Sequence, residues 1–191
     1  MPPRRPPRSE LARTVGARLR ELREAGGVSL GDLAAQAGIG KGTLSELETG
    51  RRNPTLDTLF AVTTALGVPL SAALPPGETR APGAVTVTGE AIEAVLVDRF
   101  VDSAATTELY RVTIAAGRRQ DSAPHAPGVT EHWIVYAGVL ELGPVGEPVR
   151  LGAGESTTFT GDVPHAYRAG GHADVAAALL VRYPSMTARS P

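Results

Sequence analysis

Hydrophobic positions follow two different periods along the chain. Up to Leu74, apolar residues recur every three or four positions, which is the spacing of one helix face. After Ala84 they alternate with polar residues in short runs, and glycine-containing turns separate these runs, which is typical of strands. The pattern therefore predicts a helical domain over residues 10–74 and a β domain over residues 84–184.

Five short helical segments are predicted in the first domain. Each keeps its apolar residues on one face, and in the first segment these are Leu11, Val15, Leu19 and Leu22. Glycines or prolines separate the segments, and Ser29 is a suitable N-cap for the second. The predicted segments cover residues 10–25, 29–37, 41–49, 55–66 and 69–74.

The stretch Ser29–Pro54 has the layout of a helix-turn-helix unit, in which one helix braces a second that enters the major groove of DNA. Gly38 joins the two helical patterns, and the second begins at Lys41, whose side chain reaches a guanine edge or a phosphate. Gly42 lets the backbone come close to DNA, and Arg51–Arg52 suit phosphate contacts where the chain leaves the groove. This stretch predicts double-stranded DNA as a partner.

The charge distribution agrees with this interpretation. Residues 1–76 carry ten Lys and Arg against seven Asp and Glu, about +3, whereas residues 77–191 carry nine against thirteen, about −4. A basic first part and an acidic second part fit a DNA-binding module joined to a domain of another kind. The segments outside the two domains are predicted to be a disordered basic arm (1–9), a linker (75–83) and a tail (185–191).

The composition excludes several classes of protein. Cysteine is absent, so disulfides and thiolate metal sites are excluded. No apolar run has the length of a membrane span, and no apolar segment follows the basic residues at the N-terminus. We therefore expect a cytoplasmic protein with no membrane partner. Its abundance of Ala, Gly, Pro and Arg is typical of a bacterial protein from a GC-rich genome.

Three potential metal ligands stand out in the second domain. His125 lies in a predicted turn, Glu131 begins a strand, and His165 comes from a later hairpin. Two imidazoles and a carboxylate suit a divalent metal such as Zn, Fe, Mn or Ni. Trp133 shares a strand face with Glu131 and is a candidate to line the same site, whereas His132 should point to the other side.

Residues 14–74 resemble the XRE-type, lambda-repressor-like helix-turn-helix domain. The resemblance rests on Val28-Ser29-Leu30 with Leu33-Ala34, Gly38-Ile39, Thr43-Leu44-Ser45, Leu47-Glu48, Gly50-Arg51-Arg52-Asn53-Pro54 and Leu66-Gly67-Val68. It implies a five-helix bundle in which Ser29 contacts phosphate and Glu48 pairs with Arg23. The base-facing residues that it implies are Lys41, Gly42, Thr43, Ser45 and Glu46. Leu30 stands where the family often has a glutamine that grips the DNA backbone.

The second domain resembles a cupin, an antiparallel β jelly-roll barrel. Gly117, His125, Glu131 and Gly138 match the first cupin motif, and Leu151, Gly154, Glu155, Phe159, Pro164 and His165 match the second. The resemblance implies a metal site, yet Pro127 replaces one histidine of the family's ligand set and Ala169 replaces an asparagine. Two alternatives remain open beside a metal: an effector pocket without metal, lined by His125, Glu131, Trp133 and His165, and a buried polar network with no ligand.

Together the two domains favour a transcriptional regulator that is not an enzyme. We expect it to bind its operator as a homodimer and to bind a small-molecule effector in the cupin domain. The alternative is a metal-dependent cupin enzyme, a dioxygenase or isomerase, fused to a DNA-binding domain; the missing ligand at Pro127 argues against it. An antitoxin or phage repressor would account for the first domain only.

Overall fold

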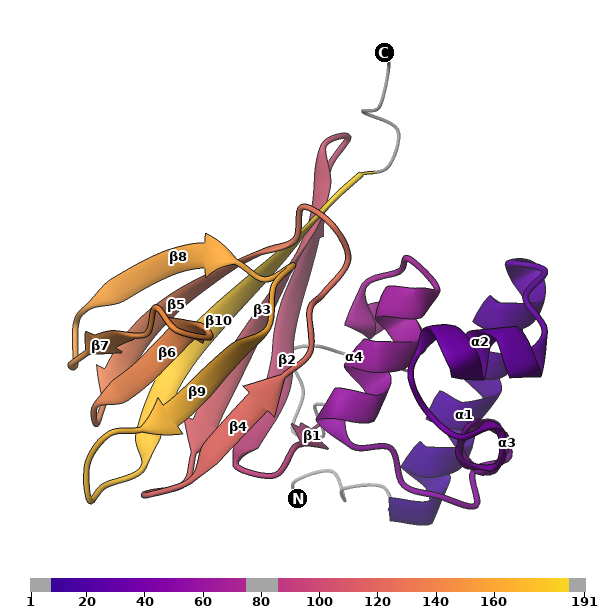
Figure 1. Cartoon of the computed structure of the whole chain (residues 1–191), viewed down its shortest axis with the longest axis horizontal. Coiled ribbons are helices and arrows are strands. Elements are labelled where there is room, and N and C mark those ends of the chain that lie inside the picture. Colours follow the sequence, from indigo (N-terminus) through magenta and orange to yellow (C-terminus); the bar gives the residue numbers. More distant parts are fainter. Residues whose placement is uncertain (1–7, 75–85, 186–191) are drawn as a thin grey trace, which may run out of the picture. The chain divides into compact units, whose positions relative to one another are not determined.

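The computed structural model describes residues 8–74 and 86–185 of the 191-residue chain. Its contacts divide the chain into two compact units, Met1–Val85 and Thr86–Pro191, which are helical and β respectively (Figure 1). Most of the predicted arm, the whole predicted linker and most of the predicted tail lie outside the described residues.

Four α-helices make up the described helical unit. They are α1 (Arg8–Ala25), α2 (Leu30–Gln36), α3 (Lys41–Glu48) and α4 (Leu56–Ala65). Their ends follow the predicted signals, because Ser29 and Thr55 cap α2 and α4 and a glycine of positive φ follows each helix. The first helix begins at Arg8, two residues before the predicted start.

The predicted fifth helix is wrong. Leu70–Ala73 (η1) is a single 3-10 turn, so the unit has four α-helices rather than five. The sequence explains the stop, because Leu74 precedes a proline and the residue before a proline disfavours the helical region. Leu74 is accordingly extended, with a ψ of 149°.

The helices pack around a small aliphatic core. Its fully buried members include Val15, Leu19, Leu33, Leu44, Leu47, Leu59, Val62 and Leu70. On α4, Val62 is fully buried, whereas the larger Phe60 is only half-buried. Helices α1 and α3 cross closely at Gly16, where an added Cβ would lie 2.1 Å from the carbonyl oxygen of Leu47. A side chain at this position would force the two helices apart.

The β unit contains ten antiparallel strands. They are β1 (Thr86–Thr88), β2 (Ile92–Val101), β3 (Ala105–Ile114), β4 (Arg119–Ser122), β5 (Thr130–Ala137), β6 (Leu140–Pro144), β7 (Val149–Leu151), β8 (Ser156–Thr160), β9 (His165–Ala169) and β10 (Val175–Pro184). Six strands form one sheet in the order β1-β2-β3-β10-β5-β8, and four form the other in the order β4-β9-β6-β7.

The β unit has the antiparallel strands of the predicted jelly roll, but they do not close into a barrel. The two sheets lie face to face (Figure 1), and among the described residues no strand pairing joins them into a closed barrel. The chain passes between them through loops such as residues 123–129, so side-chain packing holds the layers together. Strands β4 and β9 were not predicted, because they have only four and five residues and their sequences do not alternate between apolar and polar residues.

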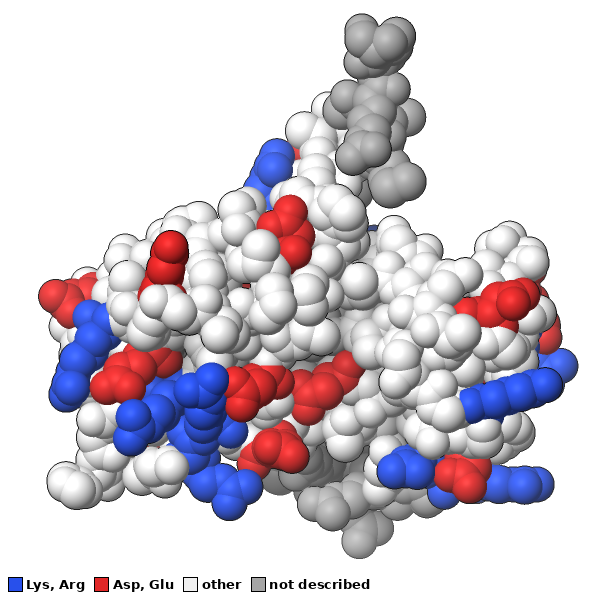
Figure 2. Space-filling model, viewed as in Figure 1, with Lys and Arg blue, Asp and Glu red and all other residues white. Residues whose placement is uncertain are grey.

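The outer face of the four-stranded sheet carries a charged row. Arg119, Arg168, Glu141 and Arg150 lie opposite one another on successive strands. Glu141 forms ion pairs with Arg168 at 3.3 Å and Arg150 at 3.5 Å, and Figure 2 shows basic and acidic side chains interleaved over these strands. This face is therefore solvated, and the other face of the sheet turns toward the interior.

Candidate functional site

The third helix presents most of the predicted DNA-contacting residues on its outer side. Leu44, Leu47 and Glu48 are buried against the rest of the unit, which leaves the opposite side of α3 in solvent. Thr43 and Ser45 are half-buried, and the exposed candidates are Ser29, Lys41, Gly42, Glu46, Arg51 and Arg52. Seven of the eight predicted positions thus lie on α3 or directly after it, and the eighth, Ser29, caps α2.

Two of these candidates have partners within the protein. Ser29 accepts a hydrogen bond from the Asp32 amide at 3.1 Å, so its hydroxyl caps α2. Arg52 Nη1 lies 3.6 Å from a carboxylate oxygen of Glu46, so this arginine after α3 pairs with a glutamate on the helix. Both pairs are exposed, so they remain accessible to DNA.

A bidentate ion pair braces the helix-turn-helix. Arg23 of α1 donates to both carboxylate oxygens of Glu48 on α3, at 2.7 and 2.8 Å, and to the Val28 carbonyl at 3.1 Å. The side chains are only 12% and 5% exposed. The pairing implied by the family resemblance is confirmed, and its role is structural, because it ties the first helix to the third.

In the β unit, the three predicted ligands come from three segments and meet in the interior. His125 lies in the loop before β5, Glu131 is the second residue of β5, and His165 begins β9 in the opposite sheet. The backbone amide of His125 donates to the Gly161 carbonyl at 2.8 Å. A Cβ at Gly161 would lie 2.8 Å from the His125 ring, so a glycine is needed for this close approach.

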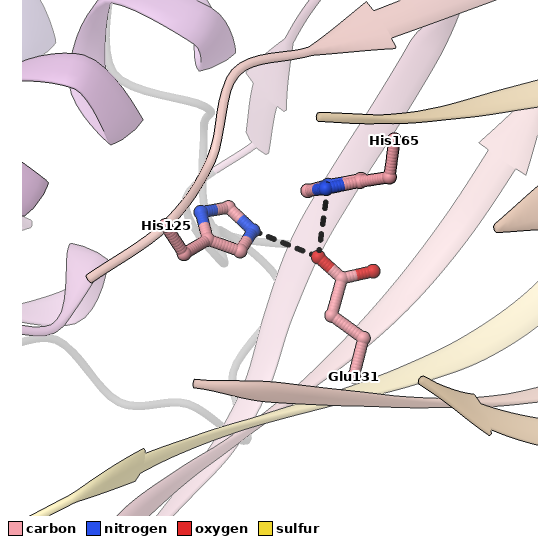
Figure 3. A group of neighbouring side chains, drawn as sticks. All are labelled: His125, Glu131 and His165. Carbon is pink, nitrogen blue, oxygen red and sulfur yellow. Dashed lines mark hydrogen bonds and ion pairs between the residues drawn. The ribbon is translucent and has the colours of Figure 1, made fainter. Parts of the chain in front are cut away.

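Both imidazoles point toward the same oxygen of Glu131 (Figure 3). His125 Nε2 lies 2.7 Å and His165 Nε2 lies 3.4 Å from Glu131 Oε1. All three residues are buried, and their potential ligand atoms lie within 4.8 Å of one another. His165 Nδ1 contacts the Val163 carbonyl at 2.7 Å, and this contact orients the ring.

Two aromatic residues complete the surroundings of Glu131. Trp133 donates its indole N–H to Oε2 at 2.8 Å, and the hydroxyl of Tyr167 contacts Oε1 at 2.9 Å and Oε2 at 2.8 Å. The candidate Trp133 therefore lies in the site. Tyr167 was not predicted, although its position two residues after His165 on β9 places it on the same strand face.

The electrostatics favour an ionised carboxylate among these donors. Burial alone would raise the pKa of Glu131, but hydrogen bonds from His125 and His165 and their charges outweigh it and hold that pKa well below its usual range. Burial opposes the charged form of His165, but its contacts with Glu131 raise the pKa of the imidazole. Burial, followed by the charge of Glu131, raises the pKa of Tyr167 well above its usual value, so the phenol remains a donor.

The neighbouring motif positions take no part in this cluster. His132 faces the other side of β5, where its Nδ1 contacts the Thr158 hydroxyl at 2.6 Å, as the strand alternation predicted. Pro127 is exposed in the loop.

Comparisons with known proteins agree on the first domain and extend to the whole chain. A family model described as helix-turn-helix matches residues 19–72. The HTH-type transcriptional regulator SutR of Escherichia coli (strain K12) is 35% identical over 175 residues, which cover 91% of this chain and 97% of that protein. The chain belongs to the XRE-type family of helix-turn-helix transcriptional regulators. As a member of this family it is a DNA-binding protein.

Solved structures include related architectures. An HTH_3 family transcriptional regulator from Vibrio cholerae superposes with a TM-score of 0.78 at 23% identity, covering 94% of this chain and 100% of that one, which shows a shared fold. The cupin domain of an XRE family regulator from Enterobacter cloacae is 35% identical, covering 41% of this chain and 83% of that one, with a TM-score of 0.40. Among the residues of this chain that the structure describes, no helix is long and apolar enough to cross a membrane.

Proposed function

We propose that this XRE-type regulator binds a specific operator through α3 and controls that binding through an effector site around Glu131. Lys41, Gly42, Thr43, Ser45 and Glu46 face the bases, and Ser29, Arg51 and Arg52 contact phosphates. The exposure of the outer side of α3, together with two exposed arginines after its end, supports this assignment. The β unit joins two chains into a homodimer, and the protein works in the cytoplasm.

One observation carries the effector site: a buried carboxylate that gathers two histidines, a tryptophan and a tyrosine from both sheets. Burying charged and polar groups costs free energy, and apolar packing of similar volume often stabilises a fold equally well. Such a cluster in the second domain of a regulator is therefore better explained by ligand recognition than by stability. Its ligand would enter between His125, Glu131, Trp133 and His165.

The donor set fits a divalent metal as one form of that ligand. His125, Glu131 and His165 would hold it, because two imidazole nitrogens and one carboxylate oxygen lie close together and the Val163 contact directs His165 Nε2 inward. A metal would supply positive charge in place of the protons that the histidines share with Glu131. The metal-free form uses the same groups to bind an organic effector directly.

The test measures operator affinity while the site is filled. A labelled operator, selected from random-sequence DNA, is titrated with the full chain by fluorescence anisotropy, with and without Zn, Fe, Mn, Ni or a panel of metabolites. We expect at least one ligand to change the affinity about five-fold or more, as a typical allosteric coupling does. Glu131→Gln should abolish the change, and Glu93→Gln, at an exposed position on β2, should retain it.

A ligand that calorimetry shows to bind in the site, and that leaves operator affinity unchanged, would refute the coupling.

The same purified protein also tests the second candidate function. The His–Glu–His set is that of metal-dependent oxygenases, so near-stoichiometric iron in the purified protein, together with turnover of oxygen, would favour a cupin enzyme fused to a DNA-binding domain. We expect neither, because the related SutR is named as a transcriptional regulator.

A further inference from the structure

The groups around Glu131 are supported by the backbone in two different ways. Glu131 and Trp133 lie on β5, which pairs with β8 on one side and β10 on the other. His165 and Tyr167 lie on β9, which pairs with β4 and β6. His125 instead lies in the loop between β4 and β5 (Figure 3). Displacing any of the other four breaks strand pairing on two sides, so His125 is the member of the cluster that moves at the lowest cost.

The cluster is closed to solvent. Glu131 and His165 are 0% exposed and His125 is 5% exposed, so a ligand reaches these side chains only when part of the protein moves. The loop that carries His125 has a solvent-exposed outer side, formed by residues 123, 124, 127 and 128, while its histidine points inward to Glu131. This loop therefore separates Glu131 from solvent.

Two backbone amides attach the loop to the turn between β8 and β9. The His125 amide donates to the Gly161 carbonyl at 2.8 Å, and the Gly128 amide donates to Oδ2 of Asp162 at 2.9 Å. At the end next to β5, the chain is anchored by Val129, which is 1% exposed and accepts a hydrogen bond from the Gly161 amide at 2.8 Å. A segment held in this way opens more readily than a strand paired on both sides.

The loop combines stiff residues with one flexible joint. Pro124 and Pro127 have a fixed φ and no backbone N–H, so the segment between them resists bending. Gly128 has a φ of 81° and directly precedes the anchored Val129. Glycine is free to change its backbone angles where other residues are not. The loop is therefore built to swing as one piece about Gly128.

We propose that residues 123–128 form a gate over the effector site, which opens about Gly128 to admit the ligand and closes to bring His125 onto it. This inference rests on the proposed effector site and names the part of the chain whose position reports its occupancy. Asp162 is the latch, because its bond with Gly128 exists only while the gate is closed. A ligand in contact with His125 holds the gate shut.

The first experiment measures the kinetics of zinc binding to the full chain. Trp133 is the single tryptophan and lies in the site, so its fluorescence follows the reaction in a stopped-flow instrument. Asp162→Ala should raise both the association and the dissociation rate about five-fold, the effect of losing one hydrogen bond. The Kd should stay unchanged, because the latch bond is present in the closed gate with and without ligand.

Asp174→Ala is the matched control for these rates. Its carboxylate also accepts a hydrogen bond from a backbone amide, that of Ala116 at 2.8 Å. It lies immediately before β10, whereas Gly128 approaches Pro184 at the other end of that strand. Asp174→Ala should leave both rates as they are in the native protein.

The second experiment is amide hydrogen exchange by NMR and needs no ligand. In the native chain, the amides of His125 and Gly128 should exchange with a common opening rate, at least about ten-fold faster than the paired amides of β5. Asp162→Ala should speed the exchange of both by the same factor as the zinc kinetics. Circular dichroism establishes that this variant is folded, and saturation with zinc should slow the exchange of His125.

The two experiments give separate grounds for rejection. A Kd that changes with Asp162→Ala while the association rate stays constant would make Asp162 part of ligand binding and overturn the gate. A His125 amide that exchanges only together with the amides of β5 would overturn it without any ligand. An opening loop combined with an operator affinity that ignores every bound ligand would retain the gate and reject the proposed regulation. A static loop combined with a ligand-sensitive operator affinity would do the reverse.

Discussion

At the scale of single residues, the two units use buried carboxylates differently. Glu48 meets one guanidinium in a bidentate pair that fixes two helices. Glu131 meets four separate side chains, one on β5, two on β9 and one in a loop, and they converge where a ligand could replace some of them. The first arrangement is complete in itself, and the second is suited to exchange.

The ion pair between Arg23 and Glu48 should be a large single contribution to the stability of the helical unit. Glu48→Gln leaves a guanidinium that is 12% exposed without its charge partner, so we expect a loss of roughly 2 kcal/mol in the free energy of unfolding, below the cost for a fully buried pair. Urea denaturation of the full chain measures it. Glu21→Gln, which breaks the exposed pair with Arg18, should leave the transition unchanged. Equal effects of the two substitutions would contradict a structural role for Glu48.

The two arginines after α3 should act on DNA affinity through phosphates. Arg51→Ala and Arg52→Ala should each lower the slope of log affinity against log salt by about one and should weaken all operator sequences alike. Lys41→Ala should instead change the preference for bases. Anisotropy titrations over a range of salt concentrations test this, with Arg111→Ala, at an exposed position on β3, as the control. An unchanged slope in both arginine variants would remove them from the interface.

At the scale of elements, glycine has two opposite roles in the helical unit. At Gly16 the crossing of α1 and α3 leaves no room for a side chain, whereas at Gly42 no atom lies within 4 Å of an added Cβ. The first glycine is required by packing within the unit. The second is not, and a requirement there must come from outside the chain.

Alanine substitutions separate these roles. Gly16→Ala should destabilise the helical unit strongly, because its Cβ would overlap the Leu47 carbonyl.

Gly42→Ala should stabilise α3 by up to about 1 kcal/mol, because alanine has the higher helix propensity. If the backbone at Gly42 approaches DNA closely, the same variant should bind the operator more weakly while melting at a higher temperature. A higher melting temperature with unchanged operator affinity would show that Gly42 does not face DNA.

At the scale of the whole molecule, one helix-turn-helix offers a small set of contacts. Gly42 contributes no side chain to the interface. Leu30 is half-buried, and it stands where related domains often have a glutamine that binds the DNA backbone. The proposed homodimer would place two such units on two half-sites, which lie one helical turn apart, about 34–36 Å, in operators read by helix-turn-helix dimers.

We therefore expect two chains on each operator. Analytical ultracentrifugation should show a dimer at micromolar concentration, and stoichiometric titration should give two chains per palindromic site. An operator cut to one half-site should lose affinity by at least a hundred-fold. A complex of one chain per operator, with the same affinity for the half-site, would contradict dimeric recognition.

The agreement between sequence and structure differs between the two units for a physical reason. Helices are specified by neighbouring residues, so the caps at Ser29 and Thr55 and the terminating glycines marked the helix ends to within about two residues. The 3-10 turn at Leu70–Ala73 was the exception, because a local pattern cannot distinguish one turn from a short helix. Strand runs were visible, but β4 and β9 lacked the alternation that marks a half-buried strand.

By itself the sequence determined the two-domain order, the helix-turn-helix and the residue types His125, Glu131 and His165 as potential ligands, because these depend on local period, caps and motif spacing. Tertiary structure decided what surrounds the carboxylate. Tyr167 and His165 reach Glu131 from the opposite sheet, contacts that depend on how the two sheets stack. Pairings between residues distant in sequence follow from collective burial of strand faces, which no local pattern encodes.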